Sequence, residues 1–73
     1  MNDAQIFHDN IKRICKKYGH RMAKIDALAG FWKGNTCVMA KHGSGVTTLH
    51  IKRYAKALEV EPAELMEGMF DAY

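Results

Sequence analysis

Residues 21–37 read RMAKIDALAGFWKGNTC, and their spacing indicates two short helices joined by a tight corner. The first helical run extends from Arg21 to Ala29 and ends at Gly30. The second run starts only two or three residues later, at Lys33, and continues to about Lys41. Two short helices connected this closely, with glycine at the corner, cross at a steep angle. We therefore expect a helix-turn-helix, a layout that leaves the second helix accessible at the surface.

The rest of the chain also has helical spacing. Its apolar residues recur at intervals of three and four, and they nowhere alternate over a length that would indicate a strand. We expect Asp3 to cap the first helix and Gly19 to end it in a left-handed turn. After a loop at residues 41–47, either Thr47 or Thr48 is suited to cap a fourth helix.

A fifth helix is expected near the C-terminus. Pro62 suits its first turn, Glu64 lies near its positive end, and Gly68 is placed to end it. A chain of 73 residues has room for one domain, and an apolar content of 48% is enough for a core. The prediction is an all-α fold, a single domain of residues 1–73 with five short helices around one core. A chain this small buries only about 60% of its unfolded surface, so a dimer interface would add stability.

Composition excludes several classes of protein. No apolar run approaches the length of about 18 residues that spans a membrane, and the N-terminus is polar, so we expect neither a membrane span nor a signal peptide. Cys15 and Cys37 form no CxxC pair, which favours a reduced, cytoplasmic setting without a disulfide. The four histidines show no paired zinc-ligand spacing, and no Cys–His pair has an orienting third group. We therefore expect no metal, no cofactor and no enzymatic activity.

The distribution of charge is more informative than its net value of +3. All eleven Lys and Arg residues lie between Lys12 and Lys56, where Asp26 is the only acid, so this segment carries +10. Residues 1–9 carry −2, and residues 59–73 carry five acids and no base. One strongly positive stretch in a small domain is typical of a surface that faces phosphates, with the acidic end turned away from it.

Three stretches fall at a recognisable mutual spacing. They are NIKRI at 10–14 with KKYG at 16–19, Ala29-Gly30 at the corner, and AKALEVEPAEL at 55–65. With them the chain resembles the DNA-binding domain of the lambda repressor and Cro family, without gaps over about four fifths of its length. The resemblance implies a five-helix domain whose second and third helices form the helix-turn-helix. It also implies a small regulator of phage or mobile-element type, a repressor that binds double-stranded DNA as a homodimer on a short palindrome.

Three residues depart from the family pattern inside the helix-turn-helix. Met22 stands where the family usually has a glutamine that binds a phosphate, and Asp26 stands where it usually has alanine. Because burying an unpaired charge is costly, we expect solvent or a base such as Lys24 or Lys33 to reach the Asp26 carboxylate. Thr36 replaces isoleucine or valine, and its hydroxyl is expected to bond back to the carbonyl four residues earlier.

The resemblance also assigns candidate DNA contacts. The residues expected to face base edges are Trp32, Lys33, Gly34, Asn35, Cys37 and Val38. Lys33 is the first candidate because lysine donates to guanine O6 and N7, and a phosphate or solvent role for it fits equally well. Val38 would either touch a thymine methyl or pack inside, and Trp32 would either stack on a sugar or, as favoured for a tryptophan at a helix start, be partly buried in the core. Met39 is expected in the core. The residues expected to contact the DNA backbone are Arg21, Lys24, Lys41, Ser44, Lys52 and Arg53.

The C-terminal segment offers a second surface. Its apolar residues either form a dimer face or close the monomer core, and the first interpretation is favoured for Met66, Met69, Phe70 and Tyr73. A different class of function also fits the departures at Met22, Asp26 and Gly34. In that alternative the domain is a protein-binding module, an antitoxin or antirepressor that holds a partner protein.

Overall fold

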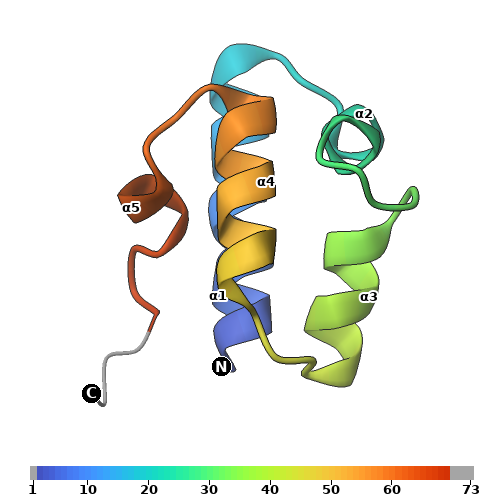
Figure 1. Cartoon of the computed structure of the whole chain (residues 1–73), viewed down its shortest axis with the longest axis vertical. Coiled ribbons are helices and arrows are strands. Elements are labelled where there is room, and N and C mark those ends of the chain that lie inside the picture. The colour runs from blue at the N-terminus through green and yellow to red at the C-terminus, as the bar shows by residue number, and fades with distance from the viewer. Residues whose placement is uncertain (1, 70–73) are drawn as a thin grey trace.

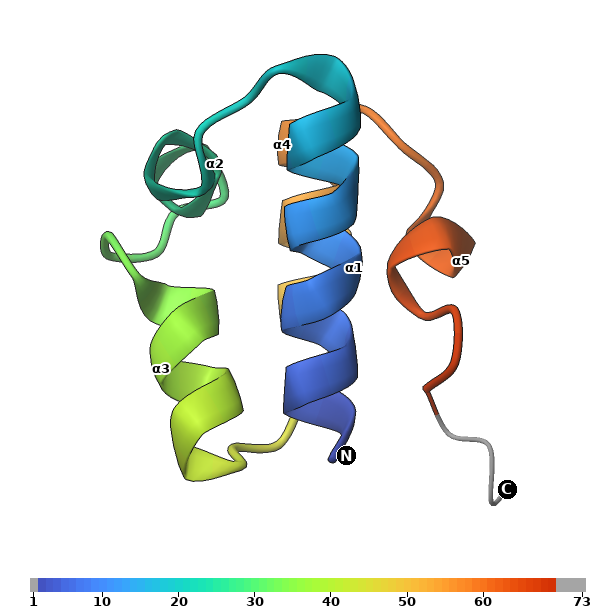
Figure 2. The same ribbon diagram turned by 180° about the vertical axis from the view of Figure 1, so that it is seen from behind.

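The computed structural model describes residues 2–69, in which helices are joined by turns and loops and no strand is present. Its elements are α1 (Asp3–Tyr18), α2 (Met22–Leu28), α3 (Asn35–His42), α4 (Thr48–Leu58) and α5 (Pro62–Leu65). The predicted all-α class and the number of helices are confirmed for these residues. Helices α1 and α4 form a central pair, with α2 and α3 on one side of it and α5 on the other (Figures 1 and 2).

Short-range hydrogen bonds fix most helix ends. Asn2, rather than Asp3, caps α1: its side chain accepts from the Gln5 backbone N–H at 2.8 Å, and the Gln5 side chain accepts from Asn2 in return. Asp3 is instead the first helical residue. Gly19 ends α1 in the left-handed conformation, with φ of 75°, as predicted. Thr47 caps α4 as predicted, in a reciprocal pair with His50.

The C-terminal helix is shorter than its apolar pattern suggested. Pro62 begins α5 as predicted, but the helix ends at Leu65 after one turn. Asn10 of α1 holds the following segment in place, because its buried side-chain amide donates to the carbonyls of Leu65 and Glu67, both at 2.8 Å. These bonds take up backbone acceptors after α5, so the chain packs back onto α1 rather than continuing as a helix.

The core lies between α1, α4 and the inner sides of the other helices. The Phe7 ring meets the Tyr54 ring edge-on at 5.5 Å, which joins α1 to α4. The largest fully buried apolar side chains are Tyr54, Phe7, Ile11, Ile25 and Leu65. None of the helices formed by residues 2–69 has the length and apolar character needed to cross a bilayer.

Candidate nucleic-acid interface

A buried carboxylate joins α2 to the start of α3. Asp26 is only 1% exposed, and it has two donors. The Tyr54 hydroxyl donates to its Oδ1 at 2.5 Å, and the Gly34 backbone N–H donates to its Oδ2 at 3.0 Å. The expectation that solvent or a lysine would reach this carboxylate is therefore wrong. A tyrosine of α4 and a backbone amide satisfy it inside the fold, and a hydrogen-bonded buried acid is tolerated where an unpaired one is not.

Asn35 extends this cluster. Its side-chain amide donates to the Tyr54 hydroxyl at 3.2 Å and contacts the Met39 sulfur at 3.5 Å. Burial, and then the hydrogen bond to Asp26, raise the pKa of Tyr54, so its hydroxyl keeps the proton that it donates. Asn35 is buried, so its assignment to the base-reading set is wrong. Met39 is buried as predicted.

The corner between α2 and α3 is longer than predicted. It spans residues 29–34, so Trp32 and Lys33 precede α3 instead of forming its first turn. Gly30 and Gly34 both have φ of 86°, a left-handed conformation that strains any residue with a Cβ. Between them, the Phe31 ring stacks on the rings of Tyr54 and His50. The Asp26–Gly34 bond and the Phe31 stack together fix the direction in which the chain enters α3.

The outer side of α3 and the corner before it carry four of the six predicted reading side chains. Trp32 is 57% exposed, Lys33 and Cys37 are exposed, and Val38 is half-buried. Lys33, Gly34 and Cys37 share one shallow hollow of about 270 Å³ with Met22. The structure therefore brings three of the six predicted residues together in this hollow, with Gly34 contributing backbone only.

Thr36 lies on the inner side of α3. It is buried, and its hydroxyl lies 3.4 Å from the Nδ1 atom of His8 on α1. The hydroxyl thus has an inter-helix partner instead of the expected bond to the carbonyl of residue 32.

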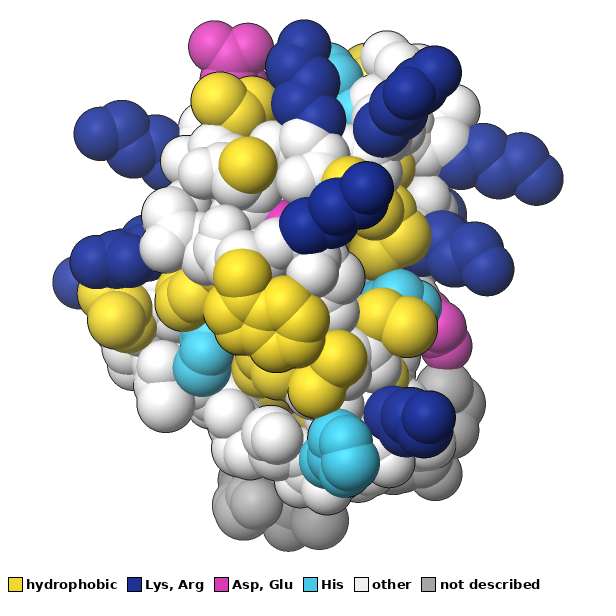
Figure 3. Space-filling view, turned by 90° about the vertical axis from the view of Figure 1, so that its right-hand side faces the viewer, with side chains coloured by type: hydrophobic (Ala, Val, Ile, Leu, Met, Phe, Trp, Pro, Cys, Tyr) yellow, Lys and Arg dark blue, Asp and Glu magenta, His cyan; other side chains and the backbone are white. Residues whose placement is uncertain are grey.

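The face formed by α2 and α3 is mixed in character. Figure 3 shows apolar side chains gathered near its middle and Lys, Arg and His side chains around them. The predicted backbone contacts are all exposed: Arg21, Lys24, Lys41, Ser44, Lys52 and Arg53. Four of them form two groups: Lys41 and Ser44 lie at the C-terminal end of α3, whereas Lys24 and Arg53 line a groove between α2 and α4.

The described glutamates of the α5 segment lie away from α3. Helices α3 and α5 are on opposite sides of the central pair (Figures 1 and 2), and the exposed glutamates Glu61, Glu64 and Glu67 belong to the α5 segment. Arg13 and Glu67 form an exposed ion pair at 3.5 Å, which is worth little in water. The acidic segment therefore leaves α3 uncovered.

The predicted dimer face is altered by the way the C-terminal segment packs. Met69 is only 6% exposed and belongs to the monomer core, and Met66 is half-buried against it. Met69 therefore closes the core of one subunit and leaves little of its side chain for a second. Phe70 and Tyr73 lie outside the described residues.

Two features of this surface escaped the sequence analysis. Tyr54 was not among the predicted site residues, although a buried aspartate in α2 requires a donor from a neighbouring helix. Lys56 and His20 were not nominated, yet both line the groove with Lys24 and Arg53. The spacing of three between Arg53 and Lys56 was the available signal, because it puts both on one helix face.

Within residues 2–69, no group of three or more His, Cys, Asp or Glu side chains is arranged to hold a metal ion. Comparisons of the chain with protein-family models, with curated proteins and with solved structures find no match.

Proposed function

We propose that this protein is a sequence-specific DNA-binding repressor with a helix-turn-helix of the lambda repressor and Cro type. The observation that carries the proposal is the exposed α3, whose outer side presents Cys37 and Lys41, with Lys33 exposed in the corner just before it. Helix α2 braces it through the Asp26–Gly34 bond, and the acidic α5 segment lies on the far side of the molecule. An exposed helix of eight residues, held at its start and surrounded by basic side chains, has the properties that entry into a major groove requires.

The exposed side chains also suggest what α3 reads. Lys33 is the one charged donor at the start of the reading surface, and its neighbours Trp32, Cys37 and Val38 are apolar or weakly polar. Lysine pairs with guanine O6 and N7, whereas apolar groups contact the methyl group of thymine. A half-site with one guanine next to thymines is the expected target.

Dimerisation remains part of the proposal. Two copies on a palindrome would place their α3 helices about one DNA turn, roughly 34 Å, apart. Since Met69 is in the monomer core, the contacts between subunits must come mainly from other residues.

Selection of bound sites from random duplex DNA at moderate salt tests the proposal. We expect an enriched sequence with two inverted half-sites. Lys33→Ala should lose preference at one base pair of each half-site, by about 1–3 kcal/mol. Lys16→Ala is the matched control: Lys16 is an exposed lysine in the last turn of α1, so its loss should weaken binding to all sequences by a similar small amount.

The salt dependence gives an independent measure. If about six phosphates are neutralised, the plot of log affinity against log salt concentration should have a slope near −5. Failure to enrich any sequence would refute sequence-specific binding. Equal effects of Lys33→Ala and Lys16→Ala on every site would remove Lys33 from the reading set, and a single half-site would refute the dimer.

A further inference from the structure

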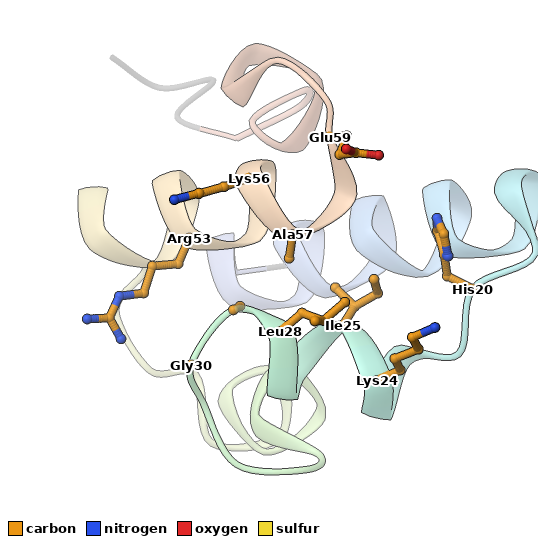
Figure 4. A pocket seen from close by; sticks show the side chains of 10 residues that line it. His20, Lys24, Ile25, Leu28, Gly30, Arg53, Lys56, Ala57 and Glu59 are labelled. Carbon is orange, nitrogen blue, oxygen red and sulfur yellow. The ribbon is translucent and has the colours of Figure 1, made fainter.

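A groove between α2 and α4 forms a hollow in the described surface. It has a volume of about 730 Å³, and Figure 4 shows the side chains that line it. Its apolar part is formed by Ile25 and Leu28 of α2 and Ala57 of α4. Leu28 is 61% exposed, which is unusual for a leucine that faces a second helix. The groove therefore offers apolar surface that the monomer itself does not cover.

Basic side chains lie at both ends of this groove. Figure 4 shows Arg53 and Lys56 at one end, Lys24 and His20 at the other, and the apolar side chains between them. Glu59 is the one acid among the lining residues. Glu59 lies on the side of His20, so the positive charge is larger at the Arg53 and Lys56 end of the groove than at the Lys24 end.

The Arg53 guanidinium is already oriented at its end of the groove. It lies 5.4 Å from the centre of the Phe31 ring, a distance at which a cation is attracted to the ring face. Gly30 leaves room for it, because a Cβ at that position would lie 3.1 Å from the Arg53 Nη1 atom. A side chain that is already oriented loses less conformational entropy when it binds an anion.

We propose that the α2–α4 groove docks an acidic segment of a partner protein, in which one bulky apolar residue lies between acidic residues. The apolar side chain would cover Leu28 and Ala57, and the carboxylates on either side would meet Arg53 with Lys56 and Lys24 with His20. A DNA backbone matches the positive ends of the groove, but its sugars and phosphates offer no bulky apolar group for Leu28. The apolar middle of the groove therefore favours a polypeptide over a nucleic acid.

This inference goes beyond DNA binding and does not depend on it. The reading surface of α3 and the groove share no residue. A partner in the groove would nevertheless take Lys24 and Arg53 from the predicted phosphate contacts, so the two ligands would compete.

Fluorescence anisotropy with a labelled synthetic peptide tests the proposal. The probe carries two aspartates on each side of one phenylalanine, and two control peptides carry serine for the phenylalanine or asparagine for the aspartates. We expect saturable binding of the probe by the full chain, with an affinity about tenfold lower for each control peptide.

Matched variants locate the binding site. Leu28→Ser should weaken probe binding about tenfold, whereas Leu49→Ser should leave it unchanged. Leu49 is the appropriate control because it is 52% exposed on α4 but does not line the groove. Lys24→Gln should weaken binding about fivefold, and Lys16→Gln on α1 should not. Thermal unfolding of each variant verifies that it is folded, and amide chemical shifts of the unaltered protein should change along α2 and α4.

Three results would overturn the proposal. If the serine peptide binds as tightly as the probe, the apolar residue contributes nothing and binding reflects only the attraction between the net charges of peptide and protein. Shift changes confined to other helices would place the peptide elsewhere. If no probe binds while Lys24→Gln weakens binding to duplex DNA, the groove faces phosphates. If the protein binds the probe as expected but does not bind DNA, the proposed function is refuted and the proposal of a peptide-binding groove stands.

Discussion

Replacing Tyr54 with phenylalanine should destabilise the domain strongly, although only one oxygen atom is removed. The Tyr54 side chain is fully buried, and its hydroxyl donates to Asp26 at 2.5 Å and accepts from Asn35 at 3.2 Å. Without it, the Asp26 carboxylate keeps only the Gly34 amide, and the Asn35 amide keeps only the Met39 sulfur. A buried polar group left unpaired costs about 1–3 kcal/mol, and a charged group costs more.

We therefore expect a loss of about 3 kcal/mol in the free energy of unfolding. A domain of this size has a total stability of only about 4–11 kcal/mol, so the effect is large. Urea unfolding followed by circular dichroism measures it directly. The melting temperature should fall by about 15 °C, since each kcal/mol shifts it by about 4–8 °C in a domain this small.

A double-mutant cycle tests the cause. If the hydroxyl acts through the carboxylate, Tyr54→Phe together with Asp26→Ala should cost at least 1 kcal/mol less than the sum of the single changes. Additive costs within about 0.5 kcal/mol would contradict this explanation, because independent sites add in that way. A cost below about 0.5 kcal/mol for Tyr54→Phe alone would show that water replaces the hydroxyl.

Three further predictions concern single side chains. Glu59 has φ of 57° at the end of α4, so Glu59→Gly should raise the free energy of unfolding by about 1 kcal/mol, and Glu59→Ala should not. Cys37 is exposed, whereas Cys15 is buried and its pKa is raised by that burial. A thiol reagent should therefore label one cysteine rapidly in the native protein and two after unfolding. Rapid labelling of both cysteines in the native protein would contradict the burial of Cys15. Burial lowers the pKa of His50, so the neutral ring stabilises the fold above the unfolded-state pKa of about 6.5, and this stability is lost as the pH falls below it. Equilibrium unfolding from pH 7.5 to 5 should show this loss, and His50→Gln, which keeps the acceptor for the Thr47 amide, should show less of it.

The sequence was most informative where structure is decided locally. Gly19, Thr47 and Pro62 act through the conformation and hydrogen bonds of their own few residues, so their positions at helix ends could be predicted. The helical class followed from the apolar spacing for the same reason.

The errors arose where a distant residue decides the outcome. Asn35 looked like a surface amide next to a corner, but Tyr54, nineteen positions away, draws it inside. The length of the corner depends on Asp26 binding the Gly34 amide and on Phe31 stacking against α4. Asp26, Phe31 and Gly34 all lie within residues 21–37, but their arrangement depends on Tyr54 of α4, which the pattern of that stretch does not specify.

Gly34 has a consequence for how this protein can change its target. Its amide is tied to Asp26 and its backbone is left-handed, so a side chain there would cost about 1 kcal/mol even though the nearest atom, on Trp32, is 3.9 Å away. Under the proposed function, the base pair opposite this position goes unread and tolerates any base. A change in the preferred DNA sequence would therefore arise from substitutions at positions 33, 37 and 38, and not from a substitution at position 34.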